Sequence, residues 1–245
     1  MPLRLIIIHG LNNSTDAFLH LKEALSERGF DCHLLCLPGH GHDRDEVKDF
    51  RESTAAFDRS MRKLINGPYA VVAFSQGALN LQMWLRDTTT PKPIAQVLLA
   101  PAISIRRSEL IQRILRLLPP TVVIKSQLPE NLRRFSHLYV RDYRTLFEGA
   151  HGFNSTLLPF EVPTQIIIDP KDELVDAQRL KKLFHDRVTF FERPYLRGRR
   201  PGKYHAIFHP EYFEDKDWER LVGLISQFIE TQKVALTKIK KSNDG

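Results

Sequence analysis

Short runs of Val, Ile and Leu recur along this chain and alternate with stretches whose apolar residues repeat at helical spacing. This alternation is typical of parallel strands joined by crossover helices, and runs that are apolar at nearly every position indicate strands covered on both faces. The sequence therefore predicts an α/β protein whose central sheet is mainly parallel. The expected strands cover residues 3–8, 31–35, 69–74, 94–99, 164–168 and 188–191. The expected helices cover residues 14–28, 53–65, 76–86, 176–184 and 217 to about 233.

One interval breaks this alternation. About sixty residues separate the expected strands at 94–99 and 164–168, far more than one crossover needs. We expect a single domain over residues 1–245, with a helical insertion at about residues 103–160. The stretch SELIQRILRLLPP within it predicts an amphipathic helix that two prolines end. The expected apolar face of this helix consists of Leu110, Ile111, Ile114, Leu115 and Leu118.

Basic residues exceed acidic ones, for a formal net charge of +7, and they concentrate in two clusters. Nine Arg or Lys residues stand against four acids between residues 101 and 160, and five stand between Arg193 and Lys203 with no acid. Such clusters usually form solvated surfaces, and beside a binding site they also attract anionic substrates or lipid head groups. The sequence has no nucleic-acid-binding motif and no basic stretch interleaved with aromatic residues, so we expect no nucleic-acid partner.

Short apolar runs and few cysteines indicate the compartment. The apolar run after Arg4 has four residues, which is too short for a signal peptide and far below the roughly 20 residues that span a bilayer. Cys32 and Cys36 would lie about 13 Å apart on one strand, too far for a disulfide, and we expect them to be buried thiols. The sequence therefore predicts a cytoplasmic protein without a transmembrane segment.

A serine stands where the third expected strand meets a helix. The stretch Ala73-Phe74-Ser75-Gln76-Gly77 matches the pattern G-x-S-x-G except for Ala at the first position. In that pattern a sharp turn between strand and helix exposes the serine hydroxyl as a nucleophile, and small residues let strand and helix pack closely. The match alone does not distinguish a nucleophile from a serine that merely joins two elements.

The loop after the first expected strand carries candidate oxyanion donors. That strand ends in His9-Gly10, and the N–H of Leu11 can face the tip of the neighbouring strand. Together with the N–H of Gln76, at the positive end of the next helix, it would form an oxyanion hole. His40 and His42 have the look of a metal pair, but no further ligand stands at a matching spacing, and we expect neither a metal nor an organic cofactor.

These features together resemble the α/β-hydrolase superfamily, nearest its monoacylglycerol-lipase and serine-aminopeptidase-like esterase branch. The resemblance extends from Leu3 to about Phe228. It is carried by the Ser75 turn, by His9-Gly10, by Pro38-Gly39-His40-Gly41, and by the stretches VPTQIIIDPKDELVD and KYHAIFHP. It implies a reduced sheet of about six strands with helices on both faces, in which the strand at residues 31–35 is an edge. It also implies that the insertion at about residues 103–160 is a helical lid, whose apolar face would line an acyl pocket if the lid closed over Ser75. An edge strand needs cover, which a homodimer would provide.

The resemblance also implies a Ser-His-Asp triad in which Ser75 is the nucleophile, Asp172 the acid and His205 the base. Asp169 is the alternative acid, although before proline it could instead cap the turn. His209 follows the candidate base by four residues and is expected to be a surface or capping residue.

The implied activity is hydrolysis of carboxylic esters, as in a carboxylesterase or a lysophospholipase or monoacylglycerol lipase, on a small acyl ester that is lipid-like or anionic. A thioesterase, peptidase or acyltransferase could use the same triad, although the basic insertion does not favour a peptidase that binds a substrate amine. A binding protein without catalytic activity could also retain the fold.

Overall fold

The computed structural model describes residues 2–41, 50–87, 89–155, 160–193 and 204–243. A six-stranded sheet lies at its centre, in the order β2-β1-β3-β4-β7-β8, and every neighbouring pair is parallel. This confirms the predicted sheet, including the edge position of residues 31–35. The strands are β1 (Arg4–Ile8), β2 (Asp31–Leu35), β3 (Tyr69–Phe74), β4 (Ala95–Leu99), β7 (Thr164–Ile168) and β8 (Val188–Phe190).

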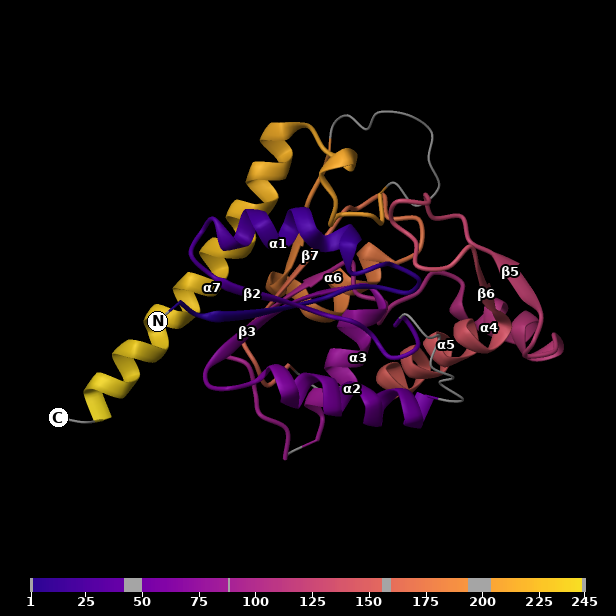
Figure 1. Cartoon of the computed structure of the whole chain (residues 1–245), viewed down its shortest axis with the longest axis horizontal. Helices are drawn as coiled ribbons and strands as arrows, with labels where there is room; N and C mark the ends of the chain where they lie inside the picture. The colour runs from indigo at the N-terminus through magenta and orange to yellow at the C-terminus, as the bar shows by residue number, and fades with distance from the viewer. Residues whose placement is uncertain (1, 42–49, 88, 156–159, 194–203, 244–245) are drawn as a thin grey trace.

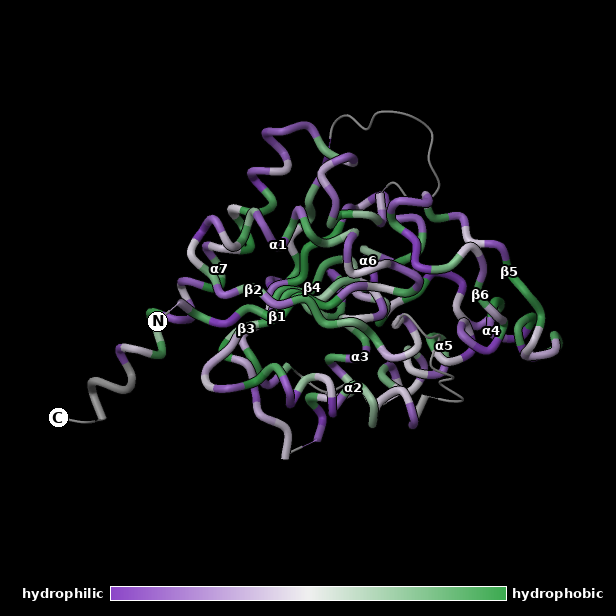
Figure 2. The backbone as a smooth tube through the Cα atoms, viewed as in Figure 1, coloured by the Kyte–Doolittle hydropathy of each residue, from purple (hydrophilic) through white to green (hydrophobic). Residues whose placement is uncertain are grey.

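The central strands are covered on both faces, as their composition predicts. Every residue of β3 and β4 is buried, and Figure 2 shows hydrophobic residues concentrated along the middle of the sheet. Helices α1 (Leu19–Ser26) and α7 (Asp215–Asn243) pack together on one face, and α2 (Phe50–Leu64) and α3 (Gln76–Leu85) pack on the other (Figure 1). Helix α6 (Ala177–Phe184) connects β7 to β8.

The described residues of the long interval between β4 and β7 form four elements at one end of the molecule (Figure 1). They are α4 (Ser108–Leu117), the short antiparallel pair β5 (Val123–Lys125) and β6 (His137–Tyr139), and α5 (Val140–Ser155). Leu115, Val140 and Phe147 form a small apolar cluster of their own there. Helix α5 also packs against α3, so this part of the chain is joined to the sheet layer.

Four expectations differ from the structure. The expected helix at residues 14–28 is a 3-10 turn at Asp16–Phe18 followed by α1, which begins at Leu19 and ends at Ser26. Helix α7 continues ten residues beyond residue 233, to Asn243, and its last turns project away from the sheet (Figure 1). Cys36 follows the end of β2 and is exposed, whereas Cys32 is buried as expected. The predicted apolar face of α4 is divided: Leu115 is buried, Ile111 and Leu118 are half-buried, and Leu110 and Ile114 are exposed, because only one side of the stripe meets α5.

Candidate active site

The predicted site residues meet at the carboxyl-terminal edge of the sheet. Leu11 follows β1, Ser75 follows β3, Asp172 follows β7, and His205 lies beyond β8. The chain leaves every parallel strand at this edge, and ligand sites of open α/β sheets lie there.

Ser75 occupies a strained turn between β3 and α3. Its backbone has φ 49° and ψ −115°, a region that residues other than glycine rarely adopt and that costs on the order of 1–3 kcal/mol. Two hydrogen bonds hold this conformation: the Ser75 N–H donates to the carbonyl of Leu99 at 3.0 Å, and the Ser75 carbonyl accepts the N–H of Ala102 at 3.1 Å. The end of β4 therefore stabilises the strained turn.

A close approach between two loops explains the glycine at position 77. A Cβ built on Gly77 would lie 2.3 Å from the carbonyl oxygen of His9, so no larger residue fits without a backbone shift. The first turn of α3 thus lies directly against the loop that contains Leu11. Gln76 is the first residue of α3, where N–H groups have no acceptor within the helix. The backbones that carry both expected oxyanion donors are neighbours.

His205 connects the serine to the acid. Its Nε2 lies 3.0 Å from Oγ of Ser75, and its Nδ1 lies 2.8 Å from Oδ2 of Asp172. An ionised carboxylate only accepts hydrogen bonds, so Nδ1 carries the proton and Nε2 is free to accept the serine O–H. All three residues are buried, and the ring of Phe74 lies against the imidazole with the centroids 4.9 Å apart. The three side chains form one continuous hydrogen-bonded chain.

Local hydrogen bonds keep Asp172 in its charged form. Burial, the largest single influence, raises the pKa of this carboxyl, but the facing His205 and the backbone N–H groups of Val175 and Leu174 lower it more, and the net shift is downward. Both N–H groups donate to Oδ1 at 2.8 Å, which leaves Oδ2 for the imidazole. Asp172 is therefore ionised at neutral pH and is oriented toward His205.

Asp169, the alternative acid, is engaged elsewhere. Its Oδ1 accepts the N–H of Lys171 at 2.9 Å, the turn-capping contact, and its Oδ2 pairs with Arg193 at 3.1 Å. Both members of this ion pair are buried. Of the two acids, the structure brings only Asp172 into hydrogen-bond contact with His205.

Two residues that sequence reasoning did not single out hold the backbone next to His205. Glu173 accepts the N–H of His205 at 3.1 Å and the N–H of Tyr204 at 3.2 Å. Arg193 donates to the carbonyl of Tyr204 at 2.7 Å while it pairs with Asp169. The turn after β7 that carries Asp169, Asp172 and Glu173, called the acid turn below, thus fixes both the ring and the backbone of His205. The other basic residues of the second predicted cluster lie outside the described residues, as does His42.

Asn12 anchors the loop that carries Leu11. It has a left-handed backbone, with φ 58°, and its N–H donates to Nε2 of His40 at 2.9 Å. Its side-chain amide donates to Oγ of Ser126 at 2.9 Å and to the carbonyl of Phe135 at 3.0 Å, and accepts the Phe135 N–H at 2.9 Å. Asn tolerates this conformation better than most residues, which is the one sequence signal that could have marked it. His40 thus serves the loop as a hydrogen-bond acceptor.

His9 ties the same loop to the end of β2. Its Nε2 accepts the N–H of Leu37 at 3.0 Å, so Nδ1 carries the proton and donates to the Gly10 carbonyl at 2.8 Å. Burial and the neighbouring His40 lower the pKa of His9 to about 3. The imidazole is neutral in the folded protein and acts as a structural bridge.

His209 is buried, and it caps the short helix at Pro210–Tyr212 by accepting the N–H of Glu211 at 3.4 Å. This agrees with the capping role expected for it, although its burial differs from a surface position.

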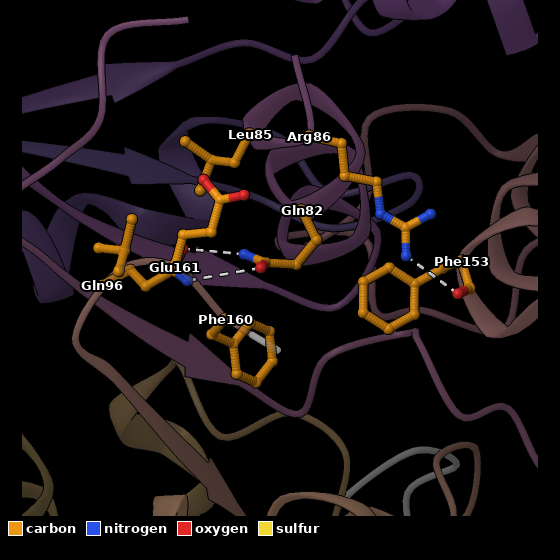
Figure 3. Close-up of a pocket in the computed structure, with 8 residues that line it drawn as sticks. Gln82, Leu85, Arg86, Gln96, Phe153, Phe160 and Glu161 are labelled. Atoms are coloured by element: carbon orange, nitrogen blue, oxygen red, sulfur yellow. Dashed lines mark hydrogen bonds between the residues drawn. The ribbon is translucent and has the colours of Figure 1, made fainter. Parts of the chain in front are cut away.

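A pocket elsewhere in the fold does not contain these residues. It is lined by Gln82, Leu85, Arg86, Gln96, Phe153, Phe160, Glu161 and Val162 (Figure 3). Gln82 lies about 10 Å along α3 from Ser75, given the rise of a helix, and Gln96 lies near the start of β4. Gln82 and Gln96 bond to each other across it at 2.8 Å. This pocket therefore lies near the amino-terminal ends of the strands, on the side of the sheet away from Ser75.

Two kinds of feature are absent from the described residues. No group of three or more His, Cys, Asp or Glu side chains there could hold a metal ion. Nor does any helix in that part of the chain combine the length and apolar character needed to cross a bilayer.

Comparisons with known proteins agree with this architecture. The family model described as the alpha/beta hydrolase fold matches residues 4–113. A search of curated proteins by sequence found no significant match.

Solved structures resemble the chain over most of its length. A monoacylglycerol lipase from Paleococcus ferrophilus has a TM-score of 0.71 at 16% identity, with 94% of each chain covered. A structure described with the metagenome-derived lipolytic enzymes LipS and LipT has a TM-score of 0.64 at 16% identity, again over 94% of each chain. Mouse alpha/beta hydrolase domain-containing protein 10 has a TM-score of 0.61 at 17% identity, over 93% of this chain and 90% of its own. The family match and the shared architecture together identify this chain as a protein of the α/β-hydrolase fold.

Proposed function

We propose that this chain is a serine hydrolase that cleaves carboxylic esters through an acyl-enzyme intermediate. The observation that carries the proposal is the hydrogen-bonded chain from Ser75 through His205 to Asp172. Nucleophile, base and orienting acid stand at the distances that such catalysis requires. The likeness in fold to a monoacylglycerol lipase and to lipolytic enzymes supports an acyl ester as the substrate class.

The first half-reaction acylates the serine. As Oγ of Ser75 attacks the ester carbonyl carbon, its proton passes to Nε2 of His205 and the carbonyl oxygen becomes an oxyanion. The backbone N–H groups of Leu11 and Gln76 stabilise that charge. The charged Asp172 stabilises the imidazolium, and when the C–O bond to the leaving group breaks, His205 donates the proton to the departing alcohol.

The second half-reaction releases the acid. A water molecule gives its proton to Nε2 of His205 as its oxygen attacks the acyl carbon, and a second oxyanion forms in the same place. The bond between the acyl carbon and Ser75 Oγ then breaks, and the proton returns to the serine. Neither half-reaction calls for a metal or an organic cofactor.

Hydrolysis of p-nitrophenyl esters of increasing acyl length, by the wild-type chain and by Ser75→Ala, tests the proposal. We expect turnover by the wild type, a loss of at least a thousandfold in the variant, and labelling of Ser75 by a fluorophosphonate probe. Turnover of thioesters or amides in preference to esters would assign the triad to a different acyl chemistry. A wild-type chain that turns over no ester and is not labelled would instead be a binding protein.

The predicted cytoplasmic location and the predicted homodimer across β2 stay predictions.

A further inference from the structure

Helix α4 exposes a stripe of large apolar side chains. Leu110, Ile114 and Leu117 are 57%, 51% and 86% exposed, and their spacing of four and then three residues places them on one side of the helix. Large apolar side chains exposed side by side are uncommon on a monomeric protein and mark surfaces that meet another phase or molecule.

The contacts that fasten the helix to α5 come from its other side and from its end. The opposite side of α4 packs on α5 through Leu115, and Gln112 donates to the carbonyl of Phe147 at 2.9 Å. Arg144 of α5 donates to the carbonyls of Leu115 and Leu118, at 2.8 and 2.6 Å, and so fastens the end of the helix. With its inner side fastened in this way, α4 presents Leu110, Ile114 and Leu117 outward as a preformed surface.

Basic residues lie beside the stripe and in the segments next to it. Residues 103–125 contain five basic residues and one acid, Glu109. Arg107, Arg113, Arg116 and Lys125 are exposed. On the helix, Arg113 and Arg116 lie along one flank of the stripe, three residues apart. An apolar stripe bordered by arginine is the pattern of helices that lie in the interface of an anionic bilayer.

The same charges disfavour a second copy of this chain as the occupant. Two stripes packed face to face would bring the arginines of one copy close to those of the other, and Glu109 is the only acid on the helix to pair with them. A surface of anionic head groups over acyl chains complements both the charge and the apolar character.

Helix α4 is joined to the turn that carries Asp172, so a surface bound to this helix would lie close to the candidate active site. The segment that enters the helix bonds to the acid turn: the Arg106 N–H donates to the Leu174 carbonyl at 2.8 Å, and its Nε donates to the Asp172 carbonyl at 2.9 Å. Leu174 is itself among the exposed large apolar residues. A surface that binds α4 would therefore adjoin the edge of the sheet that carries Ser75.

We propose that α4 is an interfacial docking helix that binds the chain reversibly to anionic lipid surfaces, with Leu110, Ile114 and Leu117 inserted among the acyl chains and Arg113 and Arg116 on the head groups. The interaction depends on apolar insertion and on charge together. It does not require catalysis, so Ser75→Ala protein should dock as the wild type does.

Flotation of the full chain with vesicles tests this proposal. Vesicles of phosphatidylcholine with 30% phosphatidylglycerol are compared with phosphatidylcholine alone, at low and high salt. We expect at least tenfold tighter binding to the anionic vesicles, weakened by salt. The triple variant L110Q/I114Q/L117Q should lose at least tenfold in binding, and R113Q/R116Q should lose severalfold with a smaller salt dependence.

Two controls keep the test specific. V234Q removes an equally exposed apolar residue from α7, and R179Q/K182Q removes two exposed basic residues at the same spacing from α6; both should bind as the wild type does. Wild-type chain that leaves anionic vesicles unbound, or a triple variant that binds them unchanged, would overturn the proposal. So would a wild-type dimer that the triple variant converts to a monomer without any vesicle binding, since the stripe would then be a self-association surface.

Discussion

The carboxylate of Glu173 accepts the backbone N–H of His205 at 3.1 Å, while the carboxylate of Asp172 accepts the ring N–H of that histidine at 2.8 Å. Two consecutive acids thus hold one residue at its backbone and at its side chain. The first contact sets where the imidazole stands and the second sets how it is turned.

Replacement of Glu173 should therefore affect the chemical step. We expect Glu173→Ala to lower kcat about tenfold at unchanged KM, because the His205 backbone loses the charge-assisted hydrogen bond that places its imidazole against Ser75. Glu173→Gln keeps an oxygen acceptor and should restore most of the rate. Steady-state kinetics on a soluble ester and the rate of fluorophosphonate labelling provide the readouts, with Glu27→Ala as an exposed control. An alanine variant with wild-type kcat and labelling rate would show that the contact does not position the base.

The two candidate acids should respond differently to the same substitution. Asp172→Asn removes the charge that selects the Nδ1–H tautomer of His205, and we expect kcat to fall by about 10³–10⁴ with little loss of stability. Asp169→Asn breaks a buried ion pair with Arg193, and we expect a loss of about 3 kcal/mol in the free energy of unfolding while the folded fraction keeps its kcat. Urea unfolding and activity per folded molecule separate the two effects. The reverse pattern would make Asp169 the catalytic acid.

The buried His9 should make the fold sensitive to acid. Its pKa is lowered to about 3 in the folded protein, against an ordinary value near 6.5 in the unfolded chain. Below pH 6.5 His9 becomes protonated in the unfolded chain but stays neutral in the folded protein. The free energy of unfolding therefore falls as the pH falls, and this loss levels off near pH 3. We expect His9 to account for about 2 kcal/mol of the loss between pH 7.5 and 5.

Urea unfolding at both pH values, for the wild type and for His9→Gln, measures this contribution. The glutamine variant should lose about 2 kcal/mol less between the two pH values, whatever its stability at pH 7.5. An identical loss in both proteins would mean that other groups, including the neighbouring His40, produce the acid sensitivity.

Two glycines offer a matched pair for the close approach at the site. Gly77→Ala places a methyl group 2.3 Å from the His9 carbonyl, and we expect it to destabilise the fold by at least about 2 kcal/mol and to reduce kcat, because the backbones beside Leu11 and Gln76 must separate. Gly223→Ala lies in α7 with nothing within 4 Å of the new Cβ, and should stabilise the fold by about 0.5–1 kcal/mol. Thermal unfolding of both variants is the measurement, and a Gly77→Ala protein as stable and active as the wild type would contradict the close approach.

The sheet could be predicted because each strand carries its own signal. The apolar run that ends at Phe74 and the small residues around Ser75 are local, and the bounds of β3 match the prediction residue for residue. Helix α5 was not predicted, since Gly149 and Gly152 weaken its helical signal, and β5 and β6 are too short to show any alternation. These are elements that tertiary contacts stabilise more than their own sequence does.

The supporting contacts of the site were beyond sequence reasoning for a different reason. Glu173 and Arg193 both bond to backbone groups near His205. Nearly every residue has such backbone groups, so no particular residue type in the sequence indicates the partner of Glu173 or Arg193. Likewise, a helical wheel of α4 shows which residues share a side but not which of them meet a neighbour, so the exposure of Leu110 and Ile114 emerged only from the packing against α5.

The amide of Asn12 joins the first loop of the sheet to residues more than a hundred positions later in the chain. Consider a chimera in which the segment between β4 and β7 is replaced by that of another protein of the same fold. Here such a chimera would remove the Ser126 hydroxyl and the Phe135 peptide from Asn12, and the loop that carries Leu11 would lose its anchor. A transplanted segment must therefore supply hydrogen-bond partners for the Asn12 side chain. Without them the chimera would have a new pocket, but the loop that carries the Leu11 N–H would no longer be held in position.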